Sequence, residues 1–116
     1  MRKYAILTEP KNGIKMIAIY TYSETEVYLF EYTTTSKYAY SDNDWLWWSV
    51  ERAEEHALSF GVNNGWTVID DPLPDCKMDI IYPVRLKWRS TAKPEHEIYE
   101  TLIDGEWVEL AEGVVQ

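Results

Sequence analysis

Residues that carry redox, metal and nucleophilic chemistry are scarce in this sequence of 116 residues. It has one cysteine, Cys76, and two histidines, His56 and His96. A lone cysteine has no partner for an intramolecular disulfide and is typical of a reducing compartment. Two histidines leave few candidates for a general base or for a zinc site with several histidine ligands. The sequence therefore predicts a cytoplasmic protein without a metal or cofactor, in which Cys76 and both histidines have structural or solvated roles.

The sequence also lacks the motifs of familiar nucleotide-binding and hydrolytic sites. It contains no G-x-G-x-x-G, no G-x-x-x-x-G-K-S/T, no G-x-S-x-G and no H-E-x-x-H. These motifs set glycine backbone against phosphate, expose a serine nucleophile or place two zinc ligands on one helix face. Their absence leaves no catalytic residue to name, and we predict that the protein is not an enzyme.

Neither a long apolar run nor an excess of basic residues is present. The longest apolar runs, such as Met16–Tyr20, span five residues, whereas a membrane-spanning helix needs about 20. The first ten residues are too polar for the apolar region of a secretory signal. Lys and Arg number 11 against 20 Asp and Glu, and the resulting net charge of −9 disfavours contact with phosphate backbones and anionic lipids. We predict no membrane span and no direct binding of nucleic acid.

The composition is that of a globular domain. Hydrophobic residues make up 46% of the chain and aromatic residues 15%, including six tryptophans, which a disordered acidic tail does not contain. Domains commonly have about 100–150 residues, so a second core has no room. Since no repeat or linker interrupts the pattern, we predict a single domain over residues 1–116.

Strand patterns dominate the first third of the chain. Arg2–Thr8 has the pattern of a strand, Ile14–Tyr22 is rich in β-branched and aromatic residues, and Glu26–Thr33 alternates two sets of mainly apolar residues between its faces. Asn12-Gly13 supplies the residues of a tight hairpin turn between the first two runs. Since the second run is apolar on both faces, we predict a three-stranded antiparallel meander with this run in the centre.

Further strands are predicted towards the C-terminus. Lys37–Tyr40 and Trp66–Ile69 are short candidates, and Met78–Trp88 is an extended pattern interrupted by a proline. The clearest hairpin joins Glu97–Ile103 to Glu106–Leu110 through a two-residue Asp-Gly link.

One segment has the pattern of a helix. Ser49 is a suitable N-cap, Gly61 is a suitable C-cap glycine, and a stripe of small apolar residues runs between them as far as Phe60. With one helix among several strands, the predicted fold class is α+β: an antiparallel sheet of about five to seven strands with one main helix packed on a face.

Four carboxylates lie within the ten residues from Asp70 to Asp79, a segment that also contains Pro72 and Pro74. A solvated loop is one interpretation. A site for a hard cation is a second, although the spacing lacks the glycine and the D-x-D/N-x-D/N pattern of a calcium loop. The third is recognition of a cationic partner, because prolines reduce the entropy that a loop loses on binding. Residues 51–75, with six acidic groups and one basic group, carry most of the excess charge.

Three indoles occur within four residues, in the run Trp45–Trp48. If this run is extended, neighbouring side chains alternate between faces, so at least one indole lies at the boundary or in solvent. One interpretation packs the first two indoles inside and lays Trp48 over the start of the helix. The other is an aromatic anchor at an interface, where Trp is enriched among hot spots. Base stacking is disfavoured because Asp42 and Asp44 repel a phosphate chain.

Parts of residues 45–88 resemble a group of small bacterial proteins. The resemblance rests on the helix that follows Trp48, on the D-P-L-P-x-C pattern that ends at Cys76, and on the P-V-R-L-K pattern over Pro83–Lys87. It implies no activity, ligand or catalytic residue. It does imply that Cys76 and Arg85 belong to one structural unit.

The first functional hypothesis is an interaction protein. A small acidic cytoplasmic domain binds and neutralises a basic partner protein, as immunity proteins, antitoxins and phage anti-defence proteins do. Negative charge steers a basic partner, and tryptophan anchors it. The residues that we expect to carry the contact are Trp47, Asp70, Asp71 and Asp75, with Asp42 and Asp44 at the rim.

The second hypothesis is a small-molecule-binding protein or a minor enzyme. Its pocket is built from aromatic residues among Trp45, Trp66 and Trp88, with Arg85 as the anchor for an anion, since ligands generally need an apolar pocket with a few polar groups. A homodimer formed through exposed aromatic residues is a third alternative.

Overall fold

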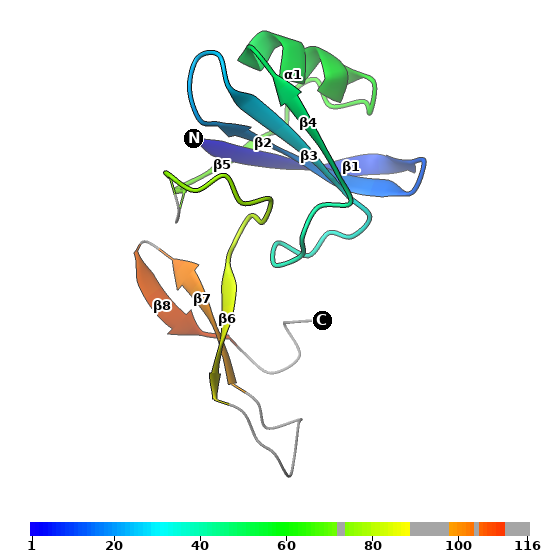
Figure 1. Cartoon of the computed structure of the whole chain (residues 1–116). Coiled ribbons are helices and arrows are strands. Elements are labelled where there is room, and N and C mark those ends of the chain that lie inside the picture. Colours follow the sequence, from blue (N-terminus) through cyan, green and yellow to red (C-terminus); the bar gives the residue numbers. More distant parts are fainter. Residues whose placement is uncertain (72–73, 89–97, 104, 111–116) are drawn as a thin grey trace.

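The described part of the chain forms eight strands and one helix, arranged as two antiparallel sheets (Figure 1). The computed structural model describes residues 1–71, 74–88, 98–103 and 105–110. In chain order the elements are β1 (Arg2–Lys11), β2 (Ile14–Thr21), β3 (Val27–Tyr32), β4 (Asn43–Trp47), α1 (Val50–Leu58), β5 (Thr67–Ile69), β6 (Val84–Trp88), β7 (Ile98–Ile103) and β8 (Glu106–Glu109). The strand orders are β4-β3-β2-β1-β5 and β6-β7-β8. Antiparallel strands with one helix agree with the α+β class predicted from the sequence, whereas the described residues form eight strands and not the predicted five to seven.

The N-terminal meander forms where alternation and turn chemistry predict it. Asn12 and Gly13 have φ angles of 53° and 82°, the left-handed conformation that a two-residue hairpin turn requires. β2 pairs with β1 on one side and with β3 on the other. Its residues from Met16 to Tyr20 are buried, so the strand with two apolar faces is the centre of the sheet.

The second sheet corrects the prediction of one sheet. Residues 78–83 are irregular, and only Val84–Trp88 of the predicted extended segment is a strand. Pro83 precedes this strand and cannot donate to a ladder. β6 therefore begins after the proline and pairs with β7 in a separate sheet, while the predicted hairpin provides β7 and β8.

Between the meander and the helix, one local prediction is wrong and one strand was not predicted. Lys37–Tyr40 forms a turn and no strand, whereas Asn43–Trp47 forms β4, which was not predicted. Asp42 and Asn43 have the composition of a loop. Pairing with β3 overrides that local preference.

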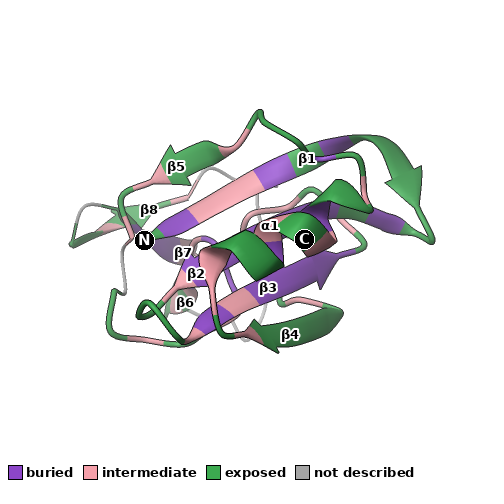
Figure 2. Ribbon diagram, turned by 90° about the horizontal axis from the view of Figure 1, so that it is seen from above, coloured by how far each residue is buried: buried purple, intermediate pink, exposed green. Residues whose placement is uncertain are grey.

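The helix and the sheet share one buried cluster on the side of α1 (Figure 2). Ala53 and Ala57 of the helix and Leu29 of β3 are fully buried within it. Alanine side chains permit close approach of a helix to the residues below. The predicted N-cap is confirmed, because the Ser49 hydroxyl accepts a hydrogen bond from the Arg52 amide at 3.2 Å. The helix ends at Leu58 with Ser59 as its C-cap, earlier than the predicted end at Phe60, and Gly61 follows in the left-handed conformation with a φ angle of 83°.

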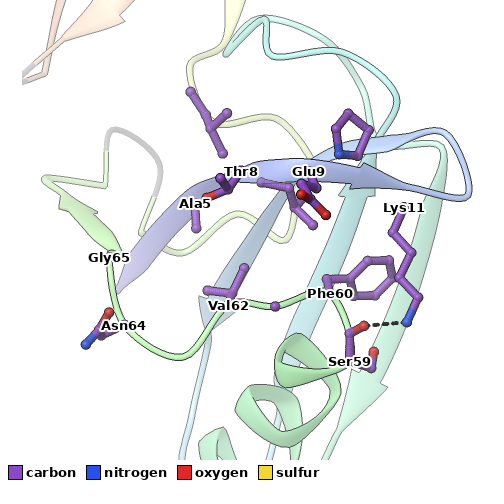
Figure 3. A pocket seen from close by; sticks show the side chains of 13 residues that line it. Ala5, Thr8, Glu9, Lys11, Ser59, Phe60, Val62, Asn64 and Gly65 are labelled. Carbon is purple, nitrogen blue, oxygen red and sulfur yellow. Dashed lines mark hydrogen bonds between the residues drawn. The ribbon is translucent and has the colours of Figure 1, made fainter.

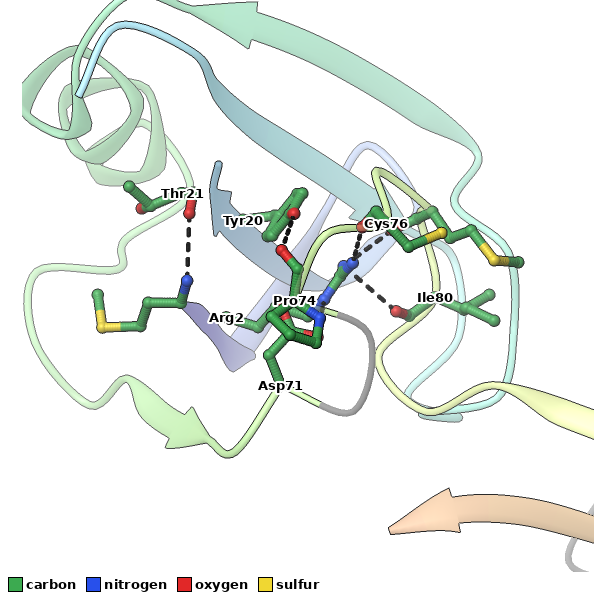
Figure 4. A network of polar contacts seen from close by, with 9 residues as sticks. Arg2, Tyr20, Thr21, Asp71, Pro74, Cys76 and Ile80 are labelled. Carbon is green, nitrogen blue, oxygen red and sulfur yellow. Dashed lines mark hydrogen bonds and ion pairs between the residues drawn. The ribbon is translucent and has the colours of Figure 1, made fainter. Parts of the chain in front are cut away.

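The opposite face of the sheet is covered by residues 74–82, and Arg2 binds carbonyls of this segment (Figure 4). The Arg2 guanidinium lies 2.8 Å from a carboxylate oxygen of Asp71, and both side chains are 6% exposed. It also donates to the carbonyls of Cys76 at 2.6 Å and Met78 at 2.8 Å. The same group stacks on the Tyr20 ring at 4.0 Å. One buried cation thus fixes the course of the acidic segment.

Tyrosine hydroxyls tie down the same segment. Tyr20 donates to the carbonyl of Pro74 at 2.6 Å, and Tyr32 donates to the carbonyl of Asp79 at 2.9 Å. Burial raises the pKa of Tyr32, and the nearby Asp79 charge raises it further. The folded protein therefore keeps a proton that the unfolded chain releases near pH 10.

Replacement of Tyr32 by phenylalanine is expected to flatten the loss of stability at alkaline pH. A pKa raised on folding gives stability that is complete below the pKa of the unfolded tyrosine and is lost as the pH rises towards the folded value. Tyr32→Phe should lower the free energy of unfolding at pH 7 by about 0.5–1.5 kcal/mol through the lost hydrogen bond. Above pH 10, the stability of the variant should decline less steeply than that of the wild type. Urea unfolding between pH 7 and 11 measures both effects.

Tyr40→Phe is the matched control, because the Tyr40 side chain is exposed. Its stability should follow the wild type at every pH. If the stability of Tyr32→Phe and of the wild type declined equally steeply above pH 10, the loss of stability at alkaline pH could not be assigned to Tyr32.

The three-stranded sheet contains its own polar cluster. The Arg85 Nη2 atom of β6 lies 3.0 Å from a carboxylate oxygen of Glu100 on β7, and the guanidinium stacks on Trp107 of β8 at 4.0 Å. Thr101 is buried and donates to the carbonyl of Pro83 at 2.8 Å. These contacts join all three strands.

Candidate functional site

β4 is an edge strand with large apolar side chains in solvent. Trp45 is 46% exposed, Leu46 is 61% exposed, and Trp48, directly after the strand, is 66% exposed. Asp42 and Asp44 are exposed beside them. We call these five residues the β4 surface. Trp45 and Leu46 point to opposite faces of the strand, and large apolar side chains exposed around one edge are typical of an interaction site.

The prediction that at least one indole of the run is exposed is confirmed, and two are. Trp47 is the one that faces the core: it is half-buried, packs against the cluster beneath α1, and has its ring centroid 5.5 Å from that of His56. Trp45 is not packed inside as the first interpretation expected. Its half-exposed ring lies against Trp47 at 6.4 Å and against His56 at 5.1 Å.

A buried carboxylate holds Trp45 in this position. Glu31 of β3 accepts a hydrogen bond from the Trp45 indole nitrogen at 2.7 Å and another from the Asn43 amide at 3.2 Å. His56 of α1 places its Nε2 atom 3.2 Å from the same carboxylate. The four side chains come from β3, β4 and α1, so Glu31 couples the edge strand to the helix.

Sequence reasoning missed Glu31, although a signal was present. The alternation of β3 places it on the same face as Val27 and Leu29, both fully buried. A charged residue in such a series is rarely buried unless it is paired. The series therefore predicts a polar partner on a neighbouring element, and here the partners are Trp45, Asn43 and His56.

Glu31→Gln is expected to lower the free energy of unfolding by about 1.5–3 kcal/mol, because the charge-assisted hydrogen bonds are lost. The glutamine also turns an amide donor towards donors that need an acceptor. Urea unfolding followed by tryptophan fluorescence measures the change. Glu55→Gln removes an exposed carboxylate of α1 and should stay within about 0.5 kcal/mol of the wild type. A Glu31→Gln protein as stable as this control would contradict the role given to Glu31.

The predicted partner-binding aspartates do not form one surface. Asp42 and Asp44 lie at β4, whereas Asp70 follows β5, at the opposite edge of the sheet. Asp75 is exposed in the segment below the sheet. Asp71 is buried against Arg2, so its predicted place on an acidic surface is corrected: a carboxylate in a buried ion pair is not available to a partner.

The residues of the predicted aromatic pocket are also dispersed. Trp45 belongs to β4, and Trp66 precedes β5 at the other edge, where Lys3 lies 4.8 Å above its ring. Trp88 and Arg85 belong to the second sheet. Cys76, which the resemblance grouped with Arg85, lies in the segment over the first sheet, where its carbonyl accepts from Arg2.

A pocket of about 540 Å³ lies elsewhere, between β1 and the residues that follow α1 (Figure 3). It is lined by Ala5–Lys11 and Ser59–Val62 together with Asn64 and Gly65. The Lys11 ammonium at its rim donates to the Ser59 carbonyl. None of the four residues predicted for a ligand pocket lines it.

Among the described residues, no group of three or more His, Cys, Asp or Glu side chains is placed to hold a metal ion. The described chain also contains no helix that is both long and apolar enough to cross a membrane.

Comparison with protein-family models, with curated proteins and with solved structures found no match to this chain. The β4 surface is therefore interpreted from its own geometry: an edge strand that exposes Trp45 and Leu46, with Asp42 and Asp44 before them and the exposed Trp48 directly after the strand.

Proposed function

We propose that this chain is a protein-binding module and that its β4 surface engages a basic protein partner. The observation that carries the proposal is the exposure of Trp45 and Leu46 on an edge strand and of Trp48 directly after it. Tryptophan is the residue most enriched among interface hot spots, since it buries a large area with little loss of conformational entropy.

Charge supports a basic partner. Between Lys37 and Arg52 the sequence has no basic residue, and it has three carboxylates, Asp42, Asp44 and Glu51. The whole chain carries a net charge of −9. Such a field accelerates association with a basic protein and discourages nucleic acid.

The fixed position of Trp45 supports the same surface as the binding site. Trp45 is held by its hydrogen bond to Glu31, and its ring is stacked near Trp47 and His56. A side chain fixed before binding loses less entropy when a partner covers it. The biological role that we propose is that of a cytoplasmic immunity, antitoxin or anti-defence protein that neutralises its basic partner.

The test is retention of a partner by purified variants. The tagged chain is used to capture proteins from the native host in low and in high salt. The Trp45→Ala, Trp48→Ala double variant should retain the captured protein at least about tenfold less well. Trp88→Ala, which removes an exposed indole from the second sheet, should retain it fully.

A charge-matched pair completes the test. Asp42→Asn with Asp44→Asn should weaken retention in low salt, whereas Asp70→Asn with Asp75→Asn removes the same charge elsewhere and should not. Thermal unfolding shows that each variant is folded. Retention unchanged by the tryptophan double variant, or no captured protein at any salt concentration, would overturn the proposal.

A further inference from the structure

The direction of backbone hydrogen bonds can be followed across the five-stranded sheet. Along a strand of an antiparallel sheet, the backbone N–H and C=O of one residue both point to one neighbouring strand, and those of the next residue both point to the strand on the other side. The Met1 amino group donates to the Thr21 carbonyl at 3.1 Å, and the Thr21 amide donates back at 2.9 Å. The backbone groups of Thr21 thus point to β1. Those of the next residue, Tyr22, point towards the β3 side, in agreement with the 3.1 Å hydrogen bond from the Tyr22 amide to the Glu26 carbonyl.

The same alternation reaches β4. Since Glu26 and Tyr28 face β2, Val27, Leu29 and Glu31 direct their backbone groups to β4. The register pairs these three residues with Trp47, Trp45 and Asn43. The residues between them, Asp44 and Leu46, therefore direct their amides and carbonyls out of the sheet. No described strand lies beyond β4, and both residues are exposed.

β4 has few of the devices that usually protect an edge. Natural edge strands are short, twisted by bulges, or carry proline or charged residues, above all lysine. β5, at the other edge, is three residues long. β4 has five residues in unbroken register with β3, contains neither lysine nor proline, and has Asp44 as its one charged residue, which disfavours an acidic strand but not a basic one.

We infer that the partner supplies an extended segment which adds to the outer edge of β4 as a further strand, with Lys or Arg opposite Asp44. This inference rests on the proposed function and specifies how the β4 surface binds. Main-chain bonds to Asp44 and Leu46 provide affinity, as in other cases of strand addition. Side chains opposite each other lie on one face, so a basic residue pairs with Asp44 and an apolar residue of the other face covers Trp45.

Charge selects this occupant over a second copy of the chain. Antiparallel self-pairing centred on Trp45 would set Asp44 of each copy opposite Leu46 of the other and would leave both aspartates without a cation. It would also bring together two chains that each carry a net charge of −9. A basic strand neutralises Asp44, and a second copy adds to the repulsion.

The probe is a short synthetic peptide of alternating lysine and valine, used with two N-methylated forms. In the inferred register the lysines face Asp44, so their amides bond to β4 while the valine amides point away. Methylation of the lysine amides should abolish binding, and methylation of the valine amides should leave it within about threefold of the parent peptide. Fluorescence titration gives the dissociation constants, and hydrogen exchange should show new protection at the amides of Asp44 and Leu46.

Two variants of one residue test the same bond from the protein side. Leu46→Pro removes an amide that points into solvent, a place where edge strands tolerate proline. Its affinity for the peptide should be at least about tenfold lower than that of the wild type. Leu46→Ala also removes the leucine side chain but keeps the backbone amide, so it should retain most of the affinity for the peptide. Thermal unfolding shows that both variants are folded.

The outcomes separate this inference from the proposed function. If both methylated peptides bind equally well, or if Leu46→Pro binds as Leu46→Ala does, strand addition is overturned and a basic partner bound through side chains still stands. Capture of a protein through the β4 surface without peptide binding overturns strand addition in the same way. A dimer that forms at micromolar concentration and is lost in Leu46→Pro assigns the edge to a second copy and overturns the inference.

Discussion

Arg2→Met should lower the free energy of unfolding by about 3–5 kcal/mol, because it leaves a buried carboxylate without the cation that faces it. Asp71 is 6% exposed and lies 2.8 Å from the guanidinium. The carbonyls of Cys76 and Met78 lose their charged donor as well. Methionine fills much of the volume of the arginine stem, so the loss reports the charge and its hydrogen bonds more than packing. Urea unfolding at pH 7 measures it.

Lys3→Met is the control at the neighbouring position. Lys3 points to the other face of the sheet and pairs with Glu54 of α1 at 2.5 Å, but Glu54 is partly exposed. Solvent screens such a pair, so the cost should be about 0–1 kcal/mol. Adding Asp71→Asn to Arg2→Met should restore part of the stability, since a neutral amide is less costly to bury than a carboxylate. A loss below about 1 kcal/mol for Arg2→Met would show that the network contributes little.

Leu29→Ala should destabilise the fold by about 2–5 kcal/mol, the range for a leucine removed from a packed core. Leu29 is 0% exposed, and it lies in the cluster beneath Ala53 and Ala57. The alanines of the helix cannot extend into the cavity, so the surroundings have little means to fill it. Thermal and urea unfolding measure the effect.

Leu46→Ala removes the same atoms from β4, the next strand, where Leu46 is 61% exposed. Its effect on stability should stay within about 0.5 kcal/mol. The two variants thus distinguish two roles of leucine in the sheet: Leu29 stabilises the fold, and Leu46 belongs to the β4 surface. Equal losses for the two variants would contradict this division.

The parts of the fold that the sequence predicted depend on neighbouring residues. Asn12-Gly13 sets a turn by its own backbone preference, and Ser49 and Gly61 end a helix through local hydrogen bonds and conformation. The division into two sheets is different, because it depends on which distant strand pairs with Val84–Trp88. β4 was missed for the same reason: only its register with β3 makes Asn43 part of a strand.

The candidate site was located in part. The tryptophan run drew attention to residues 45–48, but alternation alone does not tell which indole faces the core. Register answers that question: Trp47 lies opposite Val27, and it packs against the cluster beneath α1. Asp71 was expected in solvent because a Pro-rich acidic segment is usually exposed. Its burial depends on Arg2, a residue of the first strand that no local pattern connects to it.

The Arg2 network also bears on how the protein is made. The carbonyls that receive its guanidinium belong to residues 74 to 78 positions later in the chain. At about 5–20 residues per second, a ribosome needs roughly 4–15 s to deliver them after Arg2 has been synthesised. During that interval the meander and α1 can assemble around their own cluster while the other face of the sheet stays uncovered. The nascent chain therefore presents Tyr20, Tyr32 and an unpaired cation to the cell before the segment that encloses them exists.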